Sequence, residues 1–322
     1  MLKRVAAQLP LWARPDHPLV RHELARQTRL TWRAHLLRGL WIGLLLAALL
    51  AGGYLIATGA LRQPAGLNLT DSAAAVIYWP LLAGQVTLGI AASAITGRVI
   101  ADARRRQTWD KLRATAGGTE LALRAQWALT FYRLRGPLGI VLLLRAALII
   151  GILYDMTAFQ GRYLDLLISG IVPVVPLALA AVLLACAMTA GLLLPLTGIG
   201  FDAALGLWVG AAFQMRTYAT LAQVVLAIAR GTLLGGLALA AHAFLSGALA
   251  LPDGGGWALL AAYGALGDWG LAGLNLAFTG EVWAIIPYGI VIGPALLLFA
   301  LAQAAASDWV LARAIRRAEQ AG

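Results

Sequence analysis

Long apolar stretches constrain the fold of this chain more than any other feature. Eight stretches approach or exceed the length of about 20 apolar residues that a helix needs to cross a membrane. They are residues 39–61, 73–97, 138–155, 166–189, 191–214, 221–245, 257–280 and 282–304. A transmembrane β-barrel would instead show short segments of alternating polarity. The sequence therefore predicts an all-α, polytopic bundle of transmembrane helices.

The composition agrees with this prediction and excludes several classes of protein. Only 12% of the residues are charged, whereas a soluble domain carries roughly 25%. The one cysteine, Cys186, lies within an apolar stretch, so neither a disulfide framework nor a zinc cluster is expected. The net charge is +11. No nucleic-acid binding is expected, because no basic fold rich in aromatic residues surrounds these charges.

The positions of the basic residues predict the topology. Most lysines and arginines fall before residue 39, between residues 98 and 135, or after residue 310. Basic segments beside membrane spans mark the cytoplasmic side, and they also attract anionic lipids. We therefore expect both termini in the cytoplasm, in a multi-pass protein of a prokaryotic plasma (inner) membrane. No cleavable signal peptide is expected, because the basic N-terminal segment is too long and too polar.

With both termini on one side, the number of crossings is even, and six are preferred to eight. Six crossings keep the sequence QMRTYA, residues 214–219, on the cytoplasmic side. The stretch 166–214 then crosses once, with a re-entrant or interfacial piece, and residues 257–280 form an external re-entrant hairpin. Eight crossings would instead place Arg216 outside and leave the cytoplasmic loop 251–256 without positive charge.

The chain is accordingly divided into five parts. They are an N-terminal amphipathic, interfacial segment (1–38), two spans (39–97), a charged cytoplasmic segment (98–137), the remaining spans (138–306) and a cytoplasmic tail (307–322). The first part is expected to begin a helix at Pro18 and to lie on the membrane, or simply to form a basic flank. In the charged segment, a second helix is expected to start at Thr119 and to end at Gly136 and Pro137.

Motifs for catalysis and metal binding are missing from the sequence. It contains no GxxxxGK[ST] phosphate-binding loop, HExxH, GxSxG or CxxC. The chain is therefore expected not to be an enzyme by itself, and no metal site is expected.

Polar residues inside apolar stretches are candidate functional residues, because each is costly to bury without a partner. They are Arg145, Asp202, Arg230 and His242. Asp202 is expected to pair with an arginine from another span. Arg145 and Arg230 lie close enough to the ends of their stretches to extend toward the membrane surface. His242 is read first as a hydrogen-bonded packing residue.

The segment RRRQTWDKLRAT resembles the cytoplasmic loop after the second span in ABC-type exporter permeases of the type-2 class. That loop carries charged residues, then Thr, a hydrophobic residue and an acidic residue, then Leu and Thr. The corresponding residues here are Arg105, Thr108, Trp109, Asp110, Leu112 and Thr115. The usual proline after this helix is Ala116 here. In the family, the loop is a coupling helix that docks onto a separate ATP-hydrolysing subunit.

Two further segments resemble the same family. HPLVRHELARQTR is similar to its N-terminal motif, with Pro18 and Glu23 retained and His17 in place of Asn. AALGLWVGAAFQMRTYATLA is similar to the element after its fourth span. The matching residues there are Gly206, Leu207, Arg216 and Ala219, with Gly210 where Ser is usual.

The resemblance implies the permease subunit of an ABC exporter. Two copies, or this chain and a paralogue, would form the pathway among membrane lipids. ATP and Mg²⁺ would bind only to a cytosolic partner ATPase, with no cofactor in this chain. Trp109 and Leu112 would fill a pocket of that partner.

Two alternatives stay open beside this reading. One is a non-transporting membrane subunit that acts as the scaffold of a larger complex. The other is an ion- or proton-coupled carrier that uses Asp202 and Arg145. The sequence does not identify the substrate.

Overall fold

The computed structural model describes most of the chain from residue 69 onward and a few residues before it. The described residues are 10–15, 17–18, 20–21, 39–40, 47, 51, 69–105, 109, 114, 118–157, 177–213, 215–245, 247–266 and 289–320. Within these ranges the structure is helical and contains no strand. The predicted all-α class is therefore confirmed.

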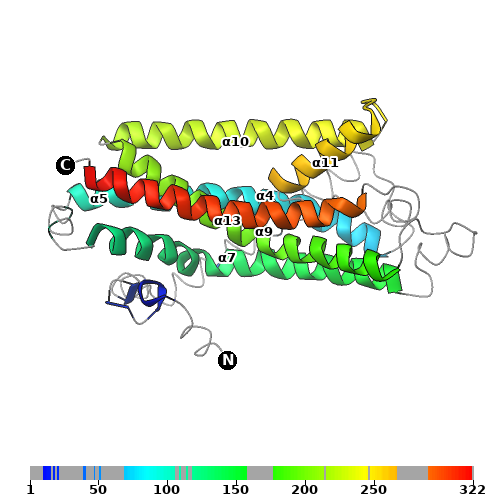
Figure 1. Cartoon of the computed structure of the whole chain (residues 1–322), viewed down its shortest axis with the longest axis horizontal. Helices are drawn as coiled ribbons and strands as arrows, with labels where there is room; N and C mark the ends of the chain where they lie inside the picture. The colour runs from blue at the N-terminus through cyan, green and yellow to red at the C-terminus, as the bar shows by residue number, and fades with distance from the viewer. Residues whose placement is uncertain are drawn as a thin grey trace, which may run out of the picture.

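Long helices running roughly along one axis form the bundle (Figure 1). The elements are η1 (Leu11–Ala13), α4 (Leu69–Gly97), α5 (Val99–Arg105), α7 (Gly118–Thr157), α9 (Leu177–Ala212), α10 (Arg216–Leu245), α11 (Asp253–Leu266) and α13 (Gly289–Gln320). Helix α9 packs against α4, α7 and α13, so it forms the centre of the bundle. Helix α10 lies along one side, where it contacts α4, α9 and α11.

Four described helical segments are long and apolar enough to cross a membrane. They are Pro80–Arg105, Ala185–Ala212, Thr217–Ala241 and Ile292–Gln320. The fold is thus that of a helical membrane protein. The six crossings and the interfacial N-terminal helix stay predictions, because most of residues 22–68 and all of residues 267–288 lie outside the described ranges. Helix α11, which overlaps the start of the expected hairpin, has 14 residues and a length of about 21 Å, less than one crossing.

The segments expected to share one side of the membrane gather at one end of the bundle. Helix α5, the start of α7, the junction between α9 and α10 and the end of α13 all lie there, whereas α11 lies at the opposite end (Figure 1). The N-terminal segment packs beside the first half of α7, since the Tyr132 hydroxyl donates to the Ala13 carbonyl over 2.8 Å.

One predicted helix limit is wrong. Pro137 does not end a helix, because α7 continues through it for 40 residues in all. Helix α9 likewise runs through Pro195, so most of the two apolar stretches 166–189 and 191–214 forms one helix. A proline removes one hydrogen bond, but an apolar helix has no water to replace the others, so it continues. Helix α13 likewise extends from the last expected span into the expected tail.

The start of the N-terminal motif is helical, as expected from Pro18. The Arg21 amide donates to the His17 carbonyl over 2.8 Å, which closes the first turn around Pro18. Val20 is buried against Ala125 and Leu129 of α7. Glu23, the other residue of this motif, lies outside the described residues.

Candidate functional site

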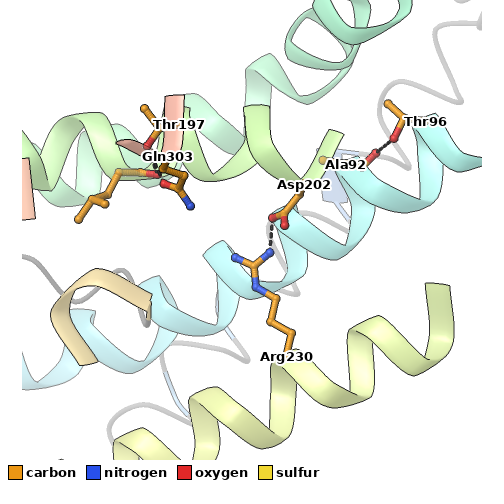
Figure 2. A network of polar contacts seen from close by, with 7 residues as sticks. Ala92, Thr96, Thr197, Asp202, Arg230 and Gln303 are labelled. Carbon is orange, nitrogen blue, oxygen red and sulfur yellow. Dashed lines mark hydrogen bonds and ion pairs between the residues drawn. The ribbon is translucent and has the colours of Figure 1, made fainter. Parts of the chain in front are cut away.

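A charged pair joins α9 to α10 in the middle of the bundle. Asp202 of α9 accepts a hydrogen bond from Arg230 of α10, and the two form a salt bridge (Figure 2). Asp202 is 5% exposed, while the Arg230 side chain is 29% exposed. A buried charge in a membrane span requires such a partner. The prediction that Asp202 pairs with an arginine from another span is confirmed.

A glycine of α4 makes room for this pair. A Cβ atom added to Gly89 would overlap the Asp202 carboxylate and lie 2.8 Å from an Arg230 guanidinium nitrogen. Since that separation is closer than real Cβ atoms approach other atoms, only glycine fits here without a shift. The pair is thus enclosed by three helices.

Arg145 of α7 is buried in the core, where it donates to two neutral oxygen atoms. It is 1% exposed, donates to Gln85 Oε1 over 2.5 Å and donates to the carbonyl of Gly191. In a regular helix this carbonyl would accept from the amide four residues later, but that residue is Pro195, which has no N–H. The guanidinium fills the vacant position. The prediction that Arg145 extends to the membrane surface is therefore wrong.

A small cavity of about 20 Å³ lies beside the charged pair. Its polar lining comes from Gln85, Asp202, Arg230 and Gln303, and its apolar lining includes Leu194 and Leu266. A polar cavity of this size has room for one water molecule. Gln303 of α13 also accepts a hydrogen bond from the Thr197 hydroxyl over 2.8 Å (Figure 2).

We call Gln85, Arg145, Asp202, Arg230 and Gln303 the polar centre. Its side chains come from α4, α7, α9, α10 and α13, so it connects every long described helix. The two glutamines were missed by the sequence reasoning, which considered only ionisable groups. The available signal was a side-chain amide in the middle of an apolar stretch. The backbone of His242 belongs to α10, but its side chain is not among those that the structure describes.

The charged segment is anchored by Trp109 at the end of the bundle. Trp109 is 3% exposed and belongs to a buried cluster, here called the Trp109 cluster. The cluster contains Ile100, Trp109, Leu123, Ala204, Leu207, Ala211, Val310, Leu311, Ala314, Ile315 and Ala318. The prediction that the Trp109 ring projects toward a partner is therefore wrong, because its surface is already covered by α7, α9 and α13.

The other residues of the segment divide into two groups. Arg105 at the end of α5 is exposed, and so is Ala114. Thr108, Asp110, Leu112 and Thr115 lie outside the described residues, so their coupling role stays a prediction.

The third motif packs α9 tightly against α4. Leu207 is fully buried in the Trp109 cluster, and Ala219 of α10 is also buried. A Cβ atom on Gly210 would lie 2.8 Å from the Gly97 carbonyl oxygen, which explains why glycine replaces serine at this position. The side chain of Arg216 is not among those that the structure describes.

Comparisons of this chain with protein-family models, with curated proteins and with solved structures found no match. Within the described ranges, His, Cys, Asp and Glu do not gather in any group of three or more that would hold a metal ion. The polar centre and the Trp109 cluster are thus the two candidate sites, one within the spans and one at their end.

Proposed function

We propose that the chain is the membrane subunit of an ATP-driven ABC exporter. A separate cytosolic ATPase, which carries ATP and Mg²⁺, docks on residues 101–115. A second copy or a paralogue completes the pathway in a prokaryotic plasma membrane, with both termini in the cytoplasm. The chain itself hydrolyses nothing.

The burial of Trp109 is the observation that carries this proposal. A docked motor must move the spans, so its docking segment needs a stiff connection to them. Trp109 supplies one, because its ring packs in a single cluster with α9 and α13. The tryptophan thus transmits force inward, while the exposed side of the segment, with Arg105 and Ala114, remains free to meet a partner.

The weak attachment of α10 supplies an element that such a motion can displace. Only 11% of its candidate span is buried, compared with 56% for that of α9. Among the described side chains, its polar links to the long helices include the Arg230–Asp202 pair and a 3.5 Å hydrogen bond from Gln223 to the Ser93 carbonyl. A tilt of α10 away from α4 and α9 opens the cavity of the polar centre.

Purification of the tagged protein from its own host, in a mild detergent, tests the proposal. We expect an ATPase with a phosphate-binding loop to co-purify and to be lost with Arg105→Glu. The matched control, Arg135→Glu, reverses an exposed charge on α7, outside the docking segment. Recovery of other membrane proteins and no ATPase would instead favour a scaffold of a larger complex.

An ion- or proton-coupled carrier is the second candidate, because the cavity lies directly against the buried Asp202 carboxylate. In the structure this carboxylate pairs with Arg230, whereas Arg145 binds Gln85 on a neighbouring helix. The carrier hypothesis predicts ion flux into protein-containing liposomes without ATP, and loss of this flux with Asp202→Asn. The exporter hypothesis predicts no flux in that experiment.

A further inference from the structure

One face of α13 carries an ordered row of exposed side chains. The row consists of Leu298, Ala302, Ala305, Trp309, Arg313 and Arg316, and we call it the α13 stripe. Successive members are three or four residues apart, so they share one face of the helix. Leu298 is 67% exposed and Trp309 is 54% exposed. The described residues therefore leave this face open over about five turns.

From Leu298 to Arg316 the stripe changes from apolar to basic, as a membrane leaflet changes from hydrocarbon to charged headgroups. Leu298 and Trp309 are separated by about 16 Å along the helix, close to half of the ~30 Å hydrocarbon core. Tryptophan prefers the boundary between hydrocarbon and headgroups. Arg313 and Arg316 follow one and two turns later, at the depth of lipid phosphates.

Arg313 is held in position by the tryptophan. Its guanidinium carbon lies 3.8 Å from the centre of the Trp309 ring. Stacking in this way orients the guanidinium and leaves its edge N–H groups free to donate to phosphate oxygens. This helix end also carries Asp308, about 100° around the helix from Trp309, and Glu319, three residues and about 60° from Arg316. With Arg313, Arg316 and Arg317 against these two carboxylates, this end of the helix keeps a net positive charge.

We propose that the α13 stripe is a binding site for one anionic phospholipid. The acyl chains lie along Leu298, Ala302 and Ala305, and the headgroup binds Arg313 and Arg316. The combination of an apolar length of one leaflet, an interfacial tryptophan and two arginines matches a lipid better than a soluble anion. The site does not depend on the proposed transport function.

Native mass spectrometry of the detergent-purified full chain tests this site. Dioleoyl phosphatidylglycerol is titrated against dioleoyl phosphatidylcholine as the neutral reference. We expect the anionic lipid to bind more tightly, and we expect Arg313→Gln with Arg316→Gln to weaken it about thirtyfold, or about fivefold per arginine. Trp309→Leu is expected to weaken it as well, with unchanged thermal unfolding.

A control double variant distinguishes lipid binding at the α13 stripe from general electrostatic attraction between the protein and anionic lipid. Arg105→Gln with Arg135→Gln removes the same charge from exposed positions outside the stripe, and we expect it to leave the affinity near that of the wild type. An equal loss in both double variants would overturn the proposal, and so would equal binding of the two lipids. A dimer that dissociates when the stripe is changed, with lipid binding unaltered, would assign the face to a second copy.

Discussion

Two contacts in the polar centre can form because a neighbouring residue lacks a particular atom. Pro195 has no amide hydrogen, so the carbonyl of Gly191 is open to Arg145. Gly89 has no side chain, so Asp202 and Arg230 can meet beside α4. Both contacts therefore depend on an atom that a neighbouring residue lacks.

Asp202→Asn is expected to destabilise the protein strongly. Removing one partner from a buried ion pair leaves the other charge uncompensated, at a cost of about 3–5 kcal/mol. The double variant Asp202→Asn with Arg230→Gln loses both charges and is expected to be more stable than Asp202→Asn alone. Thermal unfolding in detergent, followed for the four members of this cycle, measures the coupling. If the stability losses of the two single variants add up to the loss of the double variant, the two charges are not coupled.

Gly89→Ala is expected to lower the free energy of unfolding by about 1–3 kcal/mol, because the new methyl group overlaps the ion pair. Gly84→Ala on the same helix is the control, since its nearest atom, Val141 Cγ2, would lie 3.9 Å away. The same unfolding assay compares the two variants. Equal melting temperatures would contradict the placement of Gly89 against the pair.

The sequence predicts part of this chemistry and fails where three-dimensional packing decides. A lone carboxylate in an apolar stretch must find a cation, so the pairing of Asp202 was predictable. The burial of Arg145 was not, because its acceptors come from two other helices. Trp109 was read as a surface anchor for the same reason, since the residues that cover it are distant in sequence.

At the scale of elements, small residues allow α4 and α9 to pack closely. A Cβ atom on Gly206 would overlap the Thr96 hydroxyl and the Ser93 carbonyl. By contrast, Gly231 of α10 has no atom within 4 Å of such a Cβ. Small residues thus bring α4 against α9 and leave this part of α10 loosely packed.

Gly206→Ala is therefore expected to destabilise the bundle by about 1–3 kcal/mol, whereas Gly231→Ala is expected to be neutral. Both variants place alanine within an apolar helix, so their helix propensities match. Thermal unfolding of the two proteins provides the comparison. A larger effect from Gly231→Ala would show that α10 is packed more tightly than the structure indicates.

Trp109→Ala is expected to detach the charged segment, at a cost of about 3–5 kcal/mol for a buried aromatic ring. Trp109→Phe keeps most of the apolar contact and is expected to cost much less. The Trp109 Nε1 atom makes no hydrogen bond among the described residues, so phenylalanine loses none. Limited proteolysis between residues 101 and 118 measures the detachment. Equal cleavage of wild type and Trp109→Ala would contradict the anchoring role.

The helices themselves were more predictable than their limits. Apolar stretches locate α4, α9, α10 and α13, because length and polarity decide which segments can cross a membrane. The helix end expected at Pro137 was wrong. Residues 118–157 form a single helix through Pro137, since one missing N–H removes only one of the helix's many hydrogen bonds.

At the scale of the whole molecule, one end of the bundle gathers η1, α5, the start of α7 and the end of α13 (Figure 1). The Trp109 cluster joins this end to the spans, and the polar centre connects the spans to one another. A force applied at residues 101–115 would therefore reach α9 and α13 directly. We propose that a soluble ATPase applies this force.

Site-specific photo-crosslinking in the native host tests that claim most directly. A benzophenone side chain replaces the exposed Ala114 in the docking segment, and a second protein carries it at the exposed Leu298 as the control. We predict that position 114 crosslinks to a soluble protein with a phosphate-binding loop and that position 298 does not. Crosslinks from position 114 only to membrane proteins, or to lipid, would contradict an ATP-driven exporter.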